Sequence, residues 1–186
     1  YDVLNAFAGK INKNGLEILR ENENVEAVYA ERILHTTLQQ SLPLINATQV
    51  WPIQVSLGNL TGSGQTVCVV DSGIDYTHPA LGGCLGTNCK VRGGFDFFNN
   101  DTNPMDDSGH GTHVAGIVAA NGNVRGVAPD ANLIAVKVCN ANGNCSSSAM
   151  IAGVNYCVSN MNSLGTKVIT MSLGDSGSYN TNNCPN

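Results

Sequence analysis

An aspartate and a histidine in this sequence stand where side chains could transfer protons. Asp71 ends the apolar stretch QTVCVVD, and a carboxylate at the end of a buried strand is costly unless it is paired or hydrogen-bonded. His110 lies between Gly109 and Gly111, and these glycines let the chain turn and let another segment approach closely. An imidazole held by a carboxylate on one ring nitrogen can accept a proton on the other. The pair predicts a general base and its orienting carboxylate, two of the three groups that activate a nucleophile.

The elements that must carry this pair follow the pattern of an α/β fold. Three apolar runs predict buried strands: QTVCVVDSG, NLIAVKVC and KVITMSLG. Two intervening runs predict helices, GTHVAGIVAA and the serine-capped SSSAMIAGVNYCVS. This alternation predicts a three-layer fold, a parallel sheet with helices on both faces. Functional groups gather at the carboxyl ends of such strands, where Asp71 and Ser172 both lie.

The first 33 residues predict a small α+β unit. We expect a strand at VLNAFAGKI, a helix within NKNGLEILRENENV and a second strand at VEAVYAERI. A β-α-β unit of this size is too small to hold a core of its own. Residues 34–62 have low periodicity and contain prolines and glycines, so we expect an extended linker and surface segments there.

The composition argues against several classes of function. The net charge is −5 and the nine Lys and Arg residues are scattered, which gives no electrostatic footprint for nucleic acid. No apolar run approaches the length of a membrane span. The sequence begins with Tyr1 and ends in the polar stretch around Asn186, so we expect it to be a fragment of a longer chain.

The seven cysteines favour disulfides. Cys84 and Cys89 close one short loop, and Cys139 and Cys145 close another, which indicates an oxidising compartment: secreted, extracellular or cell envelope. Zinc fits less well because no Cys-x-x-Cys pair occurs. The odd count leaves two interpretations open: Cys68 is buried and free, or one cysteine pairs outside this segment.

Several motifs resemble one family, the subtilisin-like serine proteases (subtilases, peptidase S8 type). The stretches VVDSGIDYTHP and GHGTHVAG resemble the aspartate and histidine signatures of that family, and GVAPDANLIAVKV and ITMSLG fit it at the following positions. The resemblance covers residues 39–174 and implies a serine endopeptidase with an Asp-His-Ser triad, in which Asp71 orients and His110 is the base. Residues 1–38 resemble the C-terminal part of the inhibitory propeptide, so the implied domains are 1–38 and 39–186, a truncated catalytic domain.

The resemblance also implies a substrate site. Ser172, Leu173 and Gly174 would form one backbone strand beside an extended substrate, and Gly143 with Asn144 would form the other. Protein or peptide substrates would add as the middle strand, and the chain's own propeptide would do the same in cis. The implied junction lies between Leu38 and Gln39, with Leu38 in the first specificity pocket.

The sequence departs from the family pattern at three places. The Gly-Thr-Ser-Met-Ala signature of the nucleophile and the Ala-Ala-Gly-Asn stretch are absent, so we expect this segment to be inactive by itself. The chemistry implies no cofactor. Ala80 follows Pro79, where the family's strong calcium site often has an acidic residue, so structural calcium is not expected at that site although Gln40 would match one ligand. The segment LGGCLGTNCKVRGGFDFFNNDTNP resembles an insertion found in larger members.

Other interpretations stay open at this point. The chain could be a non-catalytic secreted subtilase-like module that binds peptides without cutting them. It could also be a metal-binding domain that uses His110, His113 and a nearby aspartate. We expect His113, however, to face the protein interior and to be packed there. Asp106 and Asp107 could act on His110 electrostatically or could be a solvated loop pair.

Overall fold

The computed structural model of the protein describes residues 6–31, 33–36, 45–55 and 58–174. Leu38 and Gln39, which flank the predicted cleavage site, lie outside these residues. The elements, in chain order, are α1 (Lys13–Glu21), β1 (Ile33–Thr36), α2 (Ala47–Val50), β2 (Gln54–Val55), β3 (Gly58–Asn59), β4 (Thr66–Asp71), η2 (Pro79–Leu81), β5 (Val91–Asp96), α3 (His110–Ala119), β6 (Asn132–Lys137), β7 (Asn144–Ser146), α4 (Ser147–Ser159), β8 (Thr166–Thr170) and β9 (Leu173–Gly174).

A parallel sheet in the order β5-β6-β4-β8 forms the centre of the fold. Strands β4 and β6 confirm the expected buried strands, and Asp71 lies beside Lys137 where they end. Strand β5 lies within the segment that resembles an insertion, where no strand was expected from the sequence. The pattern concealed this strand because glycines interrupt it. Gly94 is needed because a Cβ there would lie 1.9 Å from the carbonyl oxygen of Ala135 on β6.

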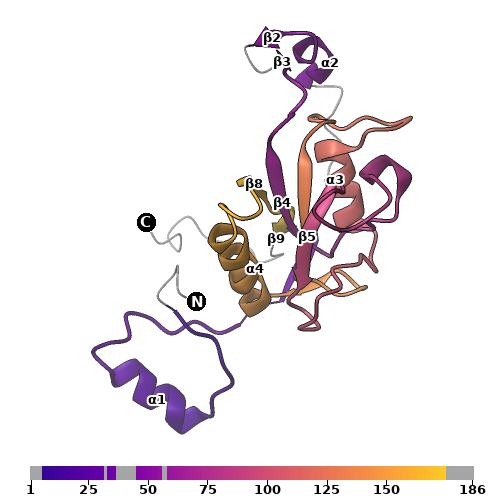
Figure 1. Cartoon of the computed structure of the whole chain (residues 1–186). Helices are drawn as coiled ribbons and strands as arrows, with labels where there is room; N and C mark the ends of the chain where they lie inside the picture. Colours follow the sequence, from indigo (N-terminus) through magenta and orange to yellow (C-terminus); the bar gives the residue numbers. More distant parts are fainter. Residues whose placement is uncertain (1–5, 32, 37–44, 56–57, 175–186) are drawn as a thin grey trace.

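Helices cover both faces of this sheet, as the sequence predicts (Figure 1). Successive side chains of a strand point to opposite faces. Val67 and Val69 of β4 pack in the cluster that contains α3, whereas Cys68 and Val70 pack in the cluster that contains α4. Every residue of β4 is buried, so the strand delivers the carboxyl group of Asp71 into the interior.

Disulfides join six cysteines of the described residues, and one of them corrects an expectation. Both expected short loops are closed, Cys84–Cys89 and Cys139–Cys145. A third bond joins Cys68 to Cys157 and ties β4 to α4 across 89 residues. The interpretation of Cys68 as a free thiol is therefore wrong, because α4 packs its Cys157 against the same face of the sheet, a contact that sequence spacing does not reveal.

The segment before the sheet is less regular than predicted. Helix α1 forms where expected, and the side chain of its N-cap Asn12 accepts a hydrogen bond from the Gly15 N–H at 2.8 Å. The described part of the first expected strand, residues 6–11, contains no strand, and of the second only Ile33 does, as the first residue of β1. The β-α-β interpretation is therefore wrong for residues 6–31. A strand needs a partner, and α1 has no buried residue and offers no packed face against which a small sheet could form. In Figure 1, α1 lies apart from the central sheet.

The run KVITMSLG divides between two sheets. Its first part forms β8 of the parallel sheet, and its last part forms β9. Strand β9 belongs to a second sheet with the order β7-β1-β9, in which both pairings are antiparallel. The expected linker also contains the short helix α2 and the β2-β3 pair.

Candidate active site

The carboxyl end of β4 places Asp71 inside the protein with its side chain fully buried. The N–H of Ser72 donates to its Oδ1 at 2.7 Å. Gly111, in the first turn of α3, lies so close that a Cβ there would be 3.1 Å from Asp71 Cβ and 2.1 Å from the carbonyl oxygen of Gly73. Glycine at position 111 therefore lets the start of α3 meet the end of β4.

Helix α3 begins at His110, and the turn before it directs the imidazole toward Asp71. Gly109 is the N-cap of α3 with a φ of 89°, a conformation that favours glycine. His110 Nδ1 lies 2.7 Å from Asp71 Oδ1, and the His110 side chain is only 14% exposed. Its other ring nitrogen, Nε2, is buried and has no hydrogen-bond partner among the described residues.

Burial and the imidazole act in opposite directions on Asp71. Burial raises the pKa of its carboxyl group and the hydrogen bond with His110 lowers it, and the net pKa is above the ordinary value. An ionised carboxylate only accepts hydrogen bonds, so the proton between the two groups belongs to Nδ1. The lone pair on Nε2 is then free to accept a proton. The geometry can support proton abstraction by His110, with Asp71 stabilising the imidazolium that forms.

Asp106 organises the loop that precedes α3. Its oxygens accept hydrogen bonds from Ser72 Oγ, from the N–H groups of Ser108, Gly109 and Thr112, and from Thr112 Oγ1. Burial raises the pKa of Asp106, but these hydrogen bonds outweigh it and the net pKa is below the ordinary value. Ser72 Oγ also accepts from the Gly111 N–H at 2.8 Å. Ser72 and Asp106 therefore fix the backbone on both sides of His110, a role that the sequence left open for Asp106 and missed for Ser72.

The residues predicted to bind substrate lie on or beside the outer strands of the second sheet. Asn144 belongs to β7, and Leu173 and Gly174 form β9. Gly143, with a φ of 75°, immediately precedes β7, and Ser172 immediately precedes β9.

The strand between these two segments is β1, from the chain itself. Residue 35 pairs with Asn144 on one side and Gly174 on the other, and residue 36 pairs with Leu173. Antiparallel pairing is made by backbone hydrogen bonds and does not depend on the side chains, so an extended segment of another sequence could form the same pairs. A segment shortly before the predicted Leu38–Gln39 junction thus lies in the position predicted for substrate.

Glu31, just before β1, contacts the start of α4. Its carboxylate accepts from Ser146 Oγ, from Ser148 Oγ, and from the Ser148 N–H at 3.1 Å. Hydrogen bonds from Ser146 and Ser148 lower the pKa of Glu31. A negative charge is favourable at a helix N-terminus, so this contact adds a second attachment of the N-terminal segment beside the backbone pairing.

The described residues do not support the metal-binding interpretation. They contain no group of three or more His, Cys, Asp or Glu side chains that could hold a metal ion. His113 is exposed, so the expectation that it packs inside is wrong: Val114 and Ala115 occupy the buried face of α3 instead. Gln40 lies outside the described residues, and Ala80 supplies no carboxylate.

No helix among the described residues is long and apolar enough to cross a membrane.

Comparison with known proteins agrees with the family resemblance of the sequence motifs. A family model described as "Subtilase family" matches residues 62–185. Subtilisin E of Bacillus subtilis is 38% identical over 178 residues, which cover 94% of this chain and 43% of the relative. Minor extracellular protease Vpr of the same species is 32% identical over 94% of this chain and 23% of the relative. Thermitase of Thermoactinomyces vulgaris is 40% identical over 134 residues, 70% of this chain and 42% of the relative. The chain spans less than half the length of these relatives.

Proposed function

Because this chain belongs to the subtilase family, we propose that it is the N-terminal part of a serine-type endopeptidase precursor. Residues 1–38 would be the end of an inhibitory propeptide, and residues 39–186 would be the first part of the catalytic domain. The nucleophilic serine would come from a segment outside residues 1–186, since the family's serine signature is absent from this sequence.

One observation carries the proposal: His110 is fixed by Asp71 on Nδ1 and keeps Nε2 without a partner among the described residues. A histidine that only stabilised the fold would satisfy both ring nitrogens, because a buried polar atom without a hydrogen bond costs about 1–3 kcal/mol. Leaving Nε2 unsatisfied has a chemical use when it accepts the proton of a nucleophile.

The proposed reaction is acyl transfer. His110 Nε2 takes the proton of the serine hydroxyl while the serine oxygen attacks the peptide carbonyl. The imidazolium returns that proton to the leaving amine, the C–N bond breaks, and an acyl-enzyme remains. Water, deprotonated by His110, then hydrolyses the ester. Asp71 keeps the proton on Nδ1 throughout and needs no cofactor to do so.

The proposed substrates are extended segments of proteins or peptides. They would enter between β7 and β9 with the backbone pairing that β1 now makes, using Gly143 and Asn144 on one side and Ser172, Leu173 and Gly174 on the other. Occupation by β1 supports an inhibitory role in cis. Cleavage between Leu38 and Gln39 would release this strand.

We further propose that the protein acts outside the cytoplasm, in the extracellular space or cell envelope. The disulfides suit an oxidising compartment. The name of one relative, Minor extracellular protease Vpr, agrees with this. No structural calcium is proposed at the family's usual position.

The test is to sequence the source DNA beyond the codon for Asn186 and to express the complete reading frame. We expect it to encode the missing serine signature and to hydrolyse a fluorogenic peptide. The variant His110→Ala should lose this activity, while the matched variant His113→Ala, on the exposed side of the same helix, should keep it. A stop codon directly after Asn186, or activity unchanged in His110→Ala, would overturn the proposal.

A specific observation also favours a second candidate, a peptide-binding module that does not cut. The second sheet already holds an extended segment in its middle position, although the family's serine signature is absent from this sequence. In that case the complete product would bind an extended peptide, with an affinity that falls when β7 or β9 is altered, and would show no hydrolysis.

A further inference from the structure

One cation lies buried at the carboxyl end of the central sheet, beside the proposed active site. Lys137 is the last residue of β6 and its side chain is 2% exposed. In the sheet register it stands between Asp71 of β4 and Asp96 of β5. A buried ammonium group is costly unless its donors are satisfied, so its partners must account for its presence.

Each of the three N–H donors of Lys137 has an acceptor. The ammonium donates to the carbonyl oxygen of Ser72 at 2.8 Å, to that of Cys139 at 2.8 Å, and to the carboxylate of Asp107 at 2.5 Å. An ammonium group has three donors and no acceptor. Its hydrogen-bonding capacity is therefore fully used, and it links three segments of the chain.

The proposed reaction requires these three segments to keep fixed positions relative to one another. Ser72 follows the carboxylate Asp71. Asp107 belongs to the loop before His110. Cys139 is bonded to Cys145 in β7, one of the two strands proposed to hold substrate. Loop segments such as 106–109 and 139–143 have no helix or strand of their own to fix them, so a shared buried cation can set their relative positions.

We propose that Lys137 is a positioning residue that fixes the Asp71–His110 pair and the substrate strand β7 relative to each other. It touches neither substrate nor the reacting atoms, and it acts through Ser72, Asp107 and the Cys139–Cys145 loop. The inference rests on the proposed function and adds a determinant of it. A misplacement of about 1 Å between catalytic groups can cost on the order of 100-fold in rate.

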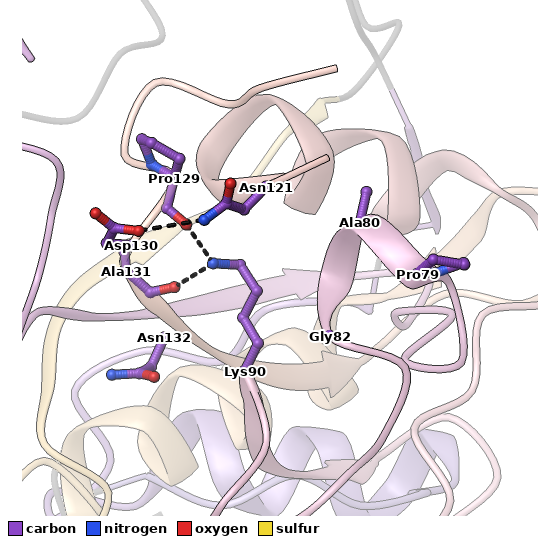
Figure 2. A pocket seen from close by; sticks show the side chains of 9 residues that line it. All are labelled: Pro79, Ala80, Gly82, Lys90, Asn121, Pro129, Asp130, Ala131 and Asn132. Carbon is purple, nitrogen blue, oxygen red and sulfur yellow. Dashed lines mark hydrogen bonds between the residues drawn. The ribbon is translucent and has the colours of Figure 1, made fainter. Parts of the chain in front are cut away.

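The chain supplies a matched control in Lys90. This lysine also directs its ammonium to two backbone carbonyls, those of Pro129 at 2.6 Å and Ala131 at 2.9 Å. Figure 2 shows it in a surface pocket lined also by Asn121 and Asp130. The volume of this pocket is about 350 Å³. Lys90 directly precedes β5 and Ala131 directly precedes β6, so this cluster lies at the amino ends of the strands, opposite the proposed active site. Burial lowers the pKa of Lys90, which agrees with its partly enclosed position.

The experiment compares Lys137→Met with Lys90→Met in the product of the complete reading frame. Both substitutions should lower the melting temperature. We expect only Lys137→Met to lower kcat and raise KM for a peptide substrate, with kcat/KM falling on the order of 100-fold. In Lys137→Met, the downfield proton NMR signal of His110 Nδ1–H should also shift or broaden. In Lys90→Met, this signal, kcat and KM should all remain as in the wild type.

If Lys137 were purely structural, both variants would still lose stability, but Lys137→Met would leave kcat, KM and the Nδ1–H signal unchanged. If Lys137→Met does not fold, Asp107→Ala decides, because it removes one contact at a partly exposed side chain and should change the same readouts by a smaller amount. Failure of the proposed function is distinguishable, since the wild-type product would then lack hydrolysis while the NMR comparison of the lysine variants still reports on positioning.

Discussion

At the scale of single residues, the site depends on which ring nitrogen of His110 carries the proton. Asp71 Oδ1 accepts at 2.7 Å from Nδ1, and this contact fixes the tautomer that leaves the Nε2 lone pair available. Asp71 accepts a second hydrogen bond from its neighbour Ser72. The carboxylate therefore orients the imidazole and is itself oriented.

Replacing Asp71 with Asn should reverse the tautomer while keeping the shape. The amide would donate to Nδ1, so the proton would move to Nε2 and His110 could no longer accept one from a nucleophile. We expect kcat of the complete reading-frame product to fall by about 10⁴-fold, with little change in KM. Steady-state kinetics on a peptide substrate measures this, and a substitution of the exposed Asp101 with Asn is the control. A fall comparable to that of the control would show that Asp71 does not orient the base.

Asp106 gives a prediction about stability and pH. In Asp106→Asn the amide NH₂ would face donors that now find a carboxylate oxygen, so the free energy of unfolding at pH 7 should fall by about 1–3 kcal/mol. The pKa of Asp106 is lowered in the folded state, so its ionised form stabilises the protein above its unfolded pKa of about 3.9. That contribution is lost as the pH falls through the lower folded value.

Urea unfolding of wild type and Asp106→Asn at pH 7 and at several values below pH 4 would check this. The difference between the two proteins should shrink as the pH falls. A difference that stayed constant, or grew toward acid, would contradict the assignment of Asp106 as an ionised, hydrogen-bonded carboxylate.

At the scale of elements, the N-terminal segment is attached to the remainder at two places that differ in kind. Strand β1 pairs through its backbone with β7 and β9, an attachment that does not titrate. Glu31 contacts the start of α4 through its carboxylate, and that attachment requires charge.

The second attachment makes binding of this segment depend on pH. The pKa of Glu31 is lowered when it contacts Ser146 and Ser148, so the contact strengthens binding above the free pKa of about 4.3 and is lost as the pH falls through the lower bound value. Glu31→Gln should weaken binding of a peptide of residues 1–38 to the protein that begins at residue 39 by about two- to fivefold at neutral pH, the range of a charge at a helix N-terminus.

Fluorescence polarisation of the labelled peptide at pH 7 and pH 3.5 would measure this affinity. Glu23, which is exposed and precedes the segment that contacts α4, provides Glu23→Gln as the matched control. Equal loss in both variants, or a Glu31→Gln effect that persists at pH 3.5, would show that the charge of Glu31 does not act at this helix.

The elements also show what the sequence could and could not predict. The sequence could predict strands β4 and β6 because each is a continuous apolar run, buried on both faces of the sheet. It could predict helices α3 and α4 because each is a longer run with one apolar face. Strand β5 could not be predicted because glycines interrupt its apolar pattern. At Gly94 the backbone of the neighbouring strand β6 leaves no room for a Cβ. The Cys68–Cys157 bond and the contacts of Lys137 depend on which elements become neighbours, and no spacing along the chain encodes that. The Asp71–His110 pair could be predicted because Asp71 ends an apolar run, His110 lies between two glycines at a helix start, and both stand in motifs that resemble the subtilase signatures.

At the scale of the whole molecule, the described residues leave one edge of the central sheet without a neighbouring strand. Strand β8 is at the edge of the sheet order, and a strand of a parallel sheet is normally buried on both faces. In β8, however, Val168 is 52% exposed, and nearby Met171 is 49% exposed. The match covers only 43% of subtilisin E and 42% of thermitase, so under the proposed function a further segment of the catalytic domain would be available to cover this side.

Expressed alone, residues 1–186 should therefore associate with one another. An exposed edge strand presents unpaired backbone groups and, here, apolar side chains to a second copy. Static light scattering across a dilution series should show mass rising with concentration. Val168→Lys should reduce the association, because a charge on an edge strand opposes pairing between copies, whereas Val124→Lys, at an exposed site in the loop after α3, should not. A soluble monomer with a single sharp melting transition would show instead that β8 needs no covering segment.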